Sequence, residues 1–171
     1  MELSRPRRIA VIGRGGAGKT LYATTLGRAL DLPVAHLDAL FWTADWKPVE
    51  RERFEAAQRA LVASDSWVID GGYLNSDGWP ERARRADVIV IADAPLPVCL
   101  WRIIRRRFRT STSRPDRPPG GHEQLSLYFL WWTVSWKWRN RALLRELVAQ
   151  GSRIVVARSV DDLDRIVAIG L

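Results

Sequence analysis

The chain has 171 residues, 47% of them hydrophobic and 27% charged, a balance that excludes a disordered or fibrous protein. Its single cysteine, Cys99, excludes a disulfide framework and a zinc site built from several cysteines, and is typical of a reducing cytoplasm. No apolar run reaches the roughly 18 residues of a membrane span, so we expect a cytoplasmic protein with no membrane among its partners.

The net charge of +8 lies entirely in the second part of the chain. Residues 1–100 carry 13 Lys or Arg and 13 Asp or Glu, whereas residues 101–171 carry 14 and 6. A basic half indicates an anionic partner, and this charge by itself leaves nucleotide phosphates, nucleic acid and a membrane surface as candidates.

Short apolar runs alternate with segments of helical spacing along the chain. We expect strands at 7–12, 33–37, 67–70, 87–92 and 153–157, and helices at 20–30, 50–63, 96–108, 123–138, 141–149 and 161–169. This alternation predicts an α/β fold with a parallel sheet covered by helices on both faces. We expect a single domain over 1–171, because helices flank the Ser-, Arg-, Pro- and Gly-rich insertion at 110–121 and no new sheet follows it.

The segment 13–20, GRGGAGKT, matches the phosphate-binding pattern G-x-x-x-x-G-K-S/T and stands between an expected strand and an expected helix. Its glycines let backbone N–H groups turn around a polyphosphate, and the helix N-terminus adds a partial positive charge. We expect Lys19 to reach the β- and γ-phosphates and the Thr20 hydroxyl to bind Mg²⁺. Arg14 either touches a phosphate or points into solvent. The predicted nucleotide-binding set is Gly13, Arg14, Gly15, Gly16, Ala17, Gly18, Lys19, Thr20 and Leu21.

Two carboxylates follow expected strands, at the sheet edge where doubly wound folds bind their ligands. Asp70 ends the third strand, and we expect it to hold Mg²⁺ through water. Asp38 follows the second strand and is predicted to orient the acceptor or to remove its proton. A cap or turn residue is the alternative for each. His36 is expected to face a helix rather than a ligand.

Seven arginines lie within sixteen residues around the end of the helix expected at 96–108: Arg102, Arg105, Arg106, Arg107, Arg109, Arg114 and Arg117. Phosphoryl transfer needs cations around the transferred oxygens. We therefore predict that Arg102 and Arg106, four apart on one helix face, act in catalysis together with Lys19 and Asp38. Arg139 and Arg141 are expected to complete this clamp. A solvated basic face is the alternative.

Nine tryptophans are a high count for this length, and five of them lie between residues 101 and 138. The helix expected at 123–138 is apolar all round, which is typical of a helix buried in the core or docked to a partner. Core packing is the default, and a nucleobase-stacking platform and a dimer patch are the alternatives. Trp42 and Trp46, close to Asp38 in sequence, are the better candidates for contacting an acceptor.

Together these segments resemble a known family. GRGGAGKT, HLDALFW, WVIDGGY, ADVIVIADAP, CLWRIIRRRF and RPD are similar, in this order over roughly residues 7–158, to the topology modulation proteins, small bacterial P-loop relatives of adenylate kinase and shikimate kinase. The resemblance implies a three-layer α/β/α fold like that of nucleoside monophosphate kinases, with strand order 2-3-1-4-5, bound ATP and Mg²⁺, and a lid over about 107–121. It also places Asp70 near Mg²⁺. The chain departs from the family's usual residues at Gly72, Leu96 and 120–122, on the acceptor side.

Our first hypothesis is an ATP-dependent phosphotransferase, a kinase whose partners are a nucleotide and a small-molecule or nucleotide acceptor. The alternative is a nucleotide-dependent regulator that binds nucleic acid and modulates DNA topology, which the basic half and the tryptophans favour. Against it, the arginines cluster where a kinase needs them, and the sequence carries no nucleic-acid-binding motif. A nucleotide-binding protein with little turnover is a third hypothesis, and both a monomer and a homodimer are compatible with the sequence.

Overall fold

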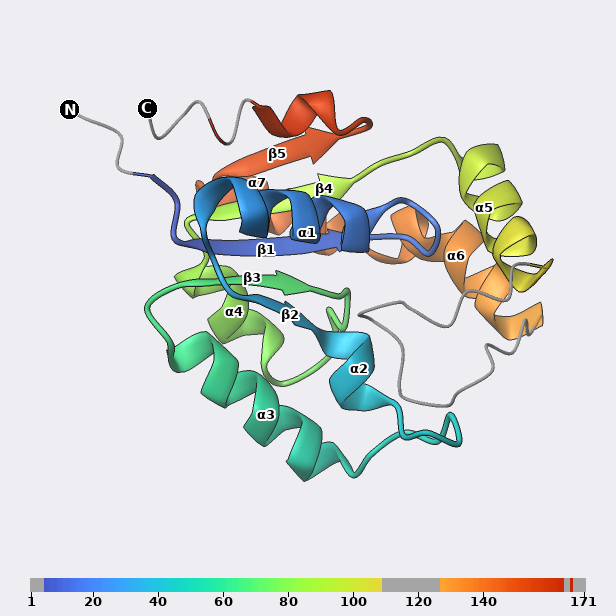
Figure 1. Cartoon of the computed structure of the whole chain (residues 1–171), viewed down its shortest axis with the longest axis horizontal. Coiled ribbons are helices and arrows are strands. Elements are labelled where there is room, and N and C mark those ends of the chain that lie inside the picture. Colours follow the sequence, from blue (N-terminus) through green and yellow to red (C-terminus); the bar gives the residue numbers. More distant parts are fainter. Residues whose placement is uncertain (1–4, 109–126, 165–166, 168–171) are drawn as a thin grey trace.

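The computed structural model describes residues 5–108, 127–164 and 167. Its sheet has five parallel strands in the order β2-β3-β1-β4-β5, which confirms the predicted fold class (Figure 1). Each strand lies within one residue of its predicted stretch at both ends. The strands are β1 (Arg8–Gly13), β2 (Val34–His36), β3 (Trp67–Asp70), β4 (Val88–Ala92) and β5 (Ile154–Ala157).

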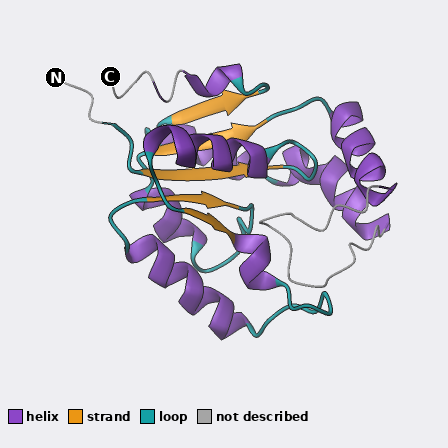
Figure 2. Ribbon diagram, in the orientation of Figure 1, coloured by secondary structure: helices purple, strands orange, loops and turns teal. Residues whose placement is uncertain are grey.

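Helices connect the strands and cover both faces of the sheet (Figure 2). They are α1 (Lys19–Leu30), α2 (Leu37–Phe41), α3 (Arg51–Ala63), α4 (Trp79–Arg85), α5 (Leu96–Phe108), α6 (Leu127–Arg139), α7 (Arg141–Ala149) and a 3₁₀ helix, η1 (Asp161–Leu163). Within the described residues, none of these helices combines the length and the apolar character that crossing a bilayer requires.

The sequence analysis missed α2 and α4. The first has five residues, and the second is a short polar segment with Pro80 in its first turn, so neither shows the apolar spacing of a longer helix. The lid expected over about 107–121 lies outside the described residues except where α5 ends. Residues 123–126 and most of the helix expected at 161–169 also lie outside them.

Two hydrophobic cores lie on opposite faces of the sheet because successive strand side chains point to opposite sides. Ile9 and Val11 pack with Leu26 of α1 on one face. Ala10 and Ile12 pack with residues of α3, α4, α6 and α7 on the other face. Figure 1 shows this arrangement, with α1 in front of the sheet and α7 behind it.

The carboxyl ends of the strands meet at one edge of the sheet, on the right of Figure 1, together with the loop after β1, α2 and the start of α5. The strand order places β1 between β3 and β4, so the chain moves to one side of β1 for β2 and β3 and to the other side for β4 and β5. Doubly wound folds bind their ligands beside such a switch point. The loop that follows β1 is therefore the first place to look for a site.

Candidate functional site

The glycine-rich loop between β1 and α1 is shaped by close packing against α5. Gly16 has φ +73, and a Cβ built on it would lie 2.5 Å from the backbone oxygen of Cys99. Only glycine fits this position without a shift of α5. Gly18, with φ 100, precedes the first residue of α1 and offers no side chain to cap the helix. The N–H groups of the first turn are thus available to an anion.

Lys19 and Thr20 stand at the start of α1. Lys19 Nζ donates a hydrogen bond to the backbone oxygen of Arg14 at 3.1 Å, so the ammonium group lies over the loop. Thr20 Oγ1 donates to Asp70 Oδ2 at 2.9 Å. The sequence separates these two residues by 50 positions, and the pairing of β1 with β3 brings them together.

Asp70 is buried at the end of β3, and its two oxygens differ sharply. Oδ2 accepts the Thr20 hydroxyl and also lies 2.9 Å from Nδ1 of His36, whereas Oδ1 is buried with no hydrogen-bond partner among the described residues. His36, expected to face a helix, instead contacts this carboxylate. An unpartnered buried carboxylate oxygen beside a hydroxyl is a suitable place for a cation or its water ligand.

The donors at this point suit Mg²⁺ rather than a metal held by the protein alone. The described residues contain no group of three or more His, Cys, Asp or Glu side chains that could hold a metal ion. Mg²⁺ is usually held by one or two protein oxygens, with water and substrate phosphates completing its octahedron. The hydroxyl of Thr20 and the carboxylate of Asp70 fit that requirement.

Asp38 lies in the first turn of α2, beside Tyr73. The Tyr73 hydroxyl donates to Asp38 Oδ1 at 2.7 Å. Burial raises the pKa of Tyr73, and the negative charge of Asp38 raises it further, so the phenol remains a proton donor. Tyr73 has φ 41, a left-handed conformation that costs energy for a side chain of this size. The fold therefore holds this hydroxyl on Asp38 against backbone strain.

Aromatic rings surround the Asp38–Tyr73 pair. The Phe41 ring centroid lies 4.8 Å from that of Trp42 and 5.0 Å from those of Phe54 and Tyr73. Trp46 lies 5.8 Å from Trp42. Trp42 and Trp46 thus belong to an aromatic cluster that includes Tyr73, the partner of Asp38, and their contact with an acceptor stays a prediction.

Arg82 of α4 is a site residue that the sequence analysis missed. Its side chain is fully buried and donates from Nη2 to the backbone oxygen of Gly72. In the part of the chain that the structure describes, Nε and Nη1 have no hydrogen-bond partner. Burial lowers the pKa of Arg82 to about 9, and the charges of Asp70 and Glu55 oppose this effect. The guanidinium is therefore charged at neutral pH. It fixes the turn that leads from Asp70 to Tyr73.

The arginines of the predicted clamp lie in different parts of the structure, and the clamp itself stays a prediction. Arg102 Nη1 donates to the backbone oxygen of Gly16 at 3.3 Å, which places this side chain against the loop, and Arg106 lies half-buried one turn further along α5. Arg139, expected in the clamp, instead lies over the ring of Trp132 at 5.0 Å and donates to the Trp132 backbone oxygen. Arg141, also expected there, lines a groove with residues of α7 and β5. Arg109, Arg114 and Arg117 lie outside the described residues, as does the side chain of Arg107.

Arg14 and Cys99 lie close together beneath the loop. Arg14 is buried, so it does not point into solvent, which was one of its two predicted positions. Burial raises the pKa of the Cys99 thiol, and the positive charge of Arg14 opposes that rise. By contrast, Leu21 is exposed at the surface of α1.

The inner side of α6 packs against the same loop. A Cβ at Gly15 would lie 2.8 Å from Thr133 Oγ1 and 2.9 Å from Phe129 Cζ, and one at Gly72 would lie 3.9 Å from Trp132 Cη2. Trp136 is buried in the core, as the default reading predicts for this helix. Trp131 and Trp138 are exposed instead.

No family model matches the sequence, and no curated protein matches it. Solved structures do match. Shikimate kinase from Acinetobacter baumannii, in complex with shikimate, is similar with a TM-score of 0.64 and 18% identity over 95% of this chain and 90% of that chain. A gluconokinase from Sinorhizobium meliloti 1021 is similar with a TM-score of 0.59 and 18% identity, over 98% of this chain and 92% of that chain. Deoxyadenosine kinase from M. mycoides, with bound dATP, has a TM-score of 0.56 and 11% identity, over 94% of this chain and 97% of that chain.

The fold is that of the P-loop kinases. The TM-scores of these three structures establish the architecture. Their sequence identities, 18% or less, leave the acceptor open. None of the comparisons shows the topology modulation family, so that resemblance stays a prediction.

Proposed function

We propose that the chain is an ATP- and Mg²⁺-dependent kinase that phosphorylates a hydroxyl group of a small molecule. One observation carries the proposal: the 2.9 Å hydrogen bond from Thr20 Oγ1 to Asp70 Oδ2 beside a glycine-rich loop. It joins the end of a phosphate-binding loop to a strand-end carboxylate, the pair of groups with which P-loop enzymes hold phosphate-bound Mg²⁺. The structural neighbours named above are kinases, which supports the same reaction class.

In this proposal the triphosphate lies on the backbone N–H groups of residues 13–20, and Lys19 binds the β- and γ-phosphates. Bound Mg²⁺ neutralises charge on the phosphate oxygens, and it would be held by Thr20 directly and by Asp70 through water. Arg102 and Arg106 stabilise the charge that spreads over the transferred oxygens.

Asp38 is the proposed partner of the acceptor. The acceptor oxygen forms a bond to the γ-phosphorus, the bond from that phosphorus to the bridging oxygen breaks, and ADP leaves with the electron pair. Asp38 accepts the hydroxyl proton, while Tyr73 holds its carboxylate in place. The aromatic rings of Trp42 and Trp46 give the acceptor an apolar surface to lie on.

The test measures ADP release by purified protein with a panel of mononucleotides, nucleosides and small alcohols. Lys19→Ala is expected to lower turnover about 100-fold or more, because it removes a cation from the transferred phosphate. Arg28→Ala removes an exposed cation from the last turn of the same helix and should leave turnover unchanged. The proposal fails if the wild-type protein shows no turnover above the Lys19→Ala variant on the whole panel.

A further inference from the structure

The outer side of α6 carries a line of large apolar side chains that face solvent. Leu127, Trp131, Val134 and Trp138 are between 49% and 85% exposed. Their spacing of four, three and four residues places them on one face of the helix. Thr133 and Trp136, on other faces of α6, are buried. Apolar patches of this kind on a protein surface usually mark an interaction site.

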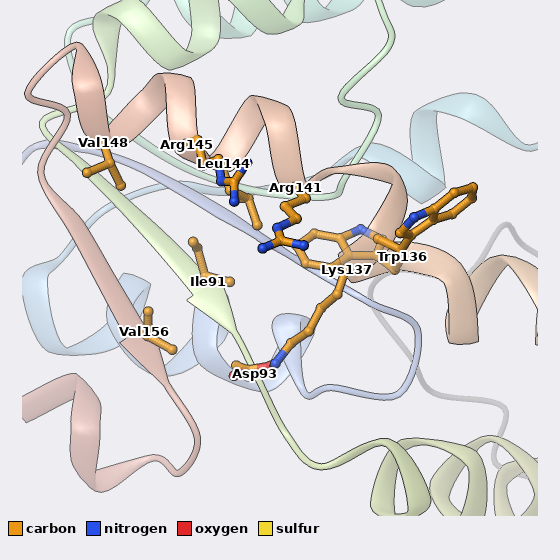
Figure 3. A pocket seen from close by; sticks show the side chains of 10 residues that line it. Ile91, Asp93, Trp136, Lys137, Arg141, Leu144, Arg145, Val148 and Val156 are labelled. Atoms are coloured by element: carbon orange, nitrogen blue, oxygen red, sulfur yellow. The ribbon is translucent and has the colours of Figure 1, made fainter.

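The line ends at Trp138, which also lines an open groove between α7 and the edge strand β5. Figure 3 shows this groove. Ile91, Leu144, Val148 and Val156 give this groove an apolar lining. Val148 and Val156 are themselves exposed. The line on α6 and the groove thus share Trp138, and we call the two together the α6–α7 face. Its exposed apolar members are Leu127, Trp131, Val134, Trp138, Val148 and Val156.

The α6–α7 face is also strongly cationic. Lys137, Arg141 and Arg145 line the groove and are exposed, and Lys137 Nζ pairs with Asp93 Oδ1 at 2.6 Å. Figure 3 shows the Lys137 side chain reaching across the groove to Asp93, while Arg141 and Arg145 project from α7. Residues 127–158 contain six Lys or Arg and a single acidic residue, Glu146. The occupant of this face must therefore offer both hydrocarbon and negative charge.

We propose that the α6–α7 face docks, parallel to the surface, on a lipid bilayer that contains anionic phospholipids. Tryptophan is favoured at the boundary between headgroups and acyl chains, leucine and valine are favoured just below it, and Lys and Arg bind headgroup phosphates. The prediction of no membrane partner rested on the lack of a spanning segment, and a helix that lies in the interface needs none. The proposal is separate from the kinase function, since the face shares no residue with the proposed catalytic set.

Two other occupants fit less well. A second copy of the chain packed face to face would bring Lys137, Arg141 and Arg145 towards their own like charges. A nucleic acid would satisfy the cations and stack on the tryptophans, but it would leave the aliphatic side chains of Leu127 and Val134 without a partner. Lipid alone pairs with every component of the surface.

The test sediments the full chain with vesicles of phosphatidylcholine alone or of phosphatidylcholine mixed with phosphatidylglycerol. Binding is expected only with the mixed vesicles and should weaken as NaCl is raised. The double variant W131S/W138S should bind the mixed vesicles at least about tenfold more weakly, because it removes apolar area that docking would bury in the bilayer. The variant R141Q/R145Q should lose roughly 25-fold, at about fivefold for each cation.

Matched controls separate this surface from general stickiness. R53Q/R59Q removes two exposed cations from α3 and should bind like the wild type. W131F/W138F keeps two apolar rings and should retain most of the binding. Circular dichroism and the thermal unfolding midpoint check that each variant is folded, and the exposed positions make that outcome the expected one.

Several results would overturn the proposal. These are no binding to mixed vesicles, equal binding to both vesicle types, and equal losses for R53Q/R59Q and R141Q/R145Q. Sedimentation velocity that shows a dimer abolished by W131S/W138S would assign the face to self-association instead. Tighter binding to DNA than to mixed vesicles, lost in the same variant, would assign it to nucleic acid. None of these results bears on ATP turnover, so the kinase proposal is tested separately.

Discussion

The buried guanidinium of Arg82 is expected to contribute strongly to stability. It donates to the backbone oxygen of Gly72, lies 4.9 Å from the ring centroid of Trp79, and is attracted by the buried carboxylates of Asp70 and Glu55. The substitution Arg82→Met keeps an apolar chain of similar shape but removes the charge and the donor. The Gly72 oxygen and the two carboxylates then lose a cationic partner inside the protein.

The expected change in stability is the loss of the interactions of Arg82, reduced by the desolvation cost that is no longer incurred. A hydrogen bond from a charged donor contributes about 1.5–3 kcal/mol, and the loss of a nearby cation for two buried carboxylates adds to that. Methionine recovers part of this loss because its burial requires no desolvation of a charge. We expect the free energy of unfolding to fall by about 2–4 kcal/mol, which lowers Tm by roughly 10 °C in a chain of this length.

The assay is urea unfolding at pH 7, followed by tryptophan fluorescence. Arg84→Met is the matched control in the same helix: Arg84 is 71% exposed and pairs with Glu81 at 2.6 Å. Such surface pairs contribute little, so the control should lose less than about 0.5 kcal/mol. If Arg82→Met were as stable as this control, or more stable than the wild type, desolvation of the guanidinium would outweigh its interactions and our account of α4 would be wrong.

Three further predictions follow from other parts of the structure. Gly16 and Gly151 both have φ +73, but a Cβ at Gly16 would lie 2.5 Å from the Cys99 oxygen while one at Gly151 meets nothing within 4 Å. In thermal unfolding, Gly151→Ala should therefore lose only about 1 kcal/mol of stability to backbone strain, and Gly16→Ala should lose clearly more. Equal losses of stability would contradict the close approach of α5 to Gly16. For Asp87, burial by itself would raise the pKa, but hydrogen bonds from the Arg8 side chain and from the N–H groups of Arg7 and Arg8 outweigh it and hold the pKa below its ordinary value. The stability that this carboxylate contributes is present above pH about 4 and is lost as the pH falls further. In urea titrations, Asp87→Asn should therefore be less stable than the wild type at about pH 7 and should match it near pH about 2. A difference in stability that does not change with pH would refute the lowered pKa of Asp87. Tyr73→Phe removes the donor to Asp38 and, on the proposed function, should lower kcat several-fold with ATP affinity unchanged, whereas unaltered kinetics would remove this pair from the acceptor site.

The sequence predicts well those features that local residue types determine. β-Branched runs such as VIVIA give buried parallel strands, and the glycine pattern at 13–20 fixes the loop and the residues around it. Features that depend on contacts between distant segments were missed. Tyr73 ends the segment WVIDGGY, but that segment gives it no role, because the role depends on a left-handed backbone that presents the hydroxyl to Asp38, 35 residues away. Arg82 reads as one basic residue among several in WPERARR, and only the burial of α4 beside Trp79 distinguishes it from Arg84.

The glycine pattern serves packing as well as phosphate binding. A Cβ at Gly13 or Gly15 would lie 2.5 Å from the Ala92 oxygen or 2.8 Å from Thr133 Oγ1, and Gly16 is equally close to α5. These three glycines are required by the neighbouring elements whether or not a nucleotide binds. Their presence is therefore weaker support for ATP binding than the sequence pattern suggests.

Gly18 separates the two roles. The nearest atoms to a Cβ there would be Arg102 Nη1 and the Tyr22 ring, at 3.7 Å or more, so packing does not demand glycine. Gly18→Ala should lose about as much stability as Gly151→Ala, because both acquire about 1 kcal/mol of left-handed backbone strain. It should nevertheless weaken ATP binding by tenfold or more, because the methyl group stands at the first turn of α1, where the phosphates would lie. Calorimetry with ATP and Mg²⁺ measures this directly. Unchanged affinity in a folded Gly18→Ala variant would refute the placement of the phosphates at the first turn of α1.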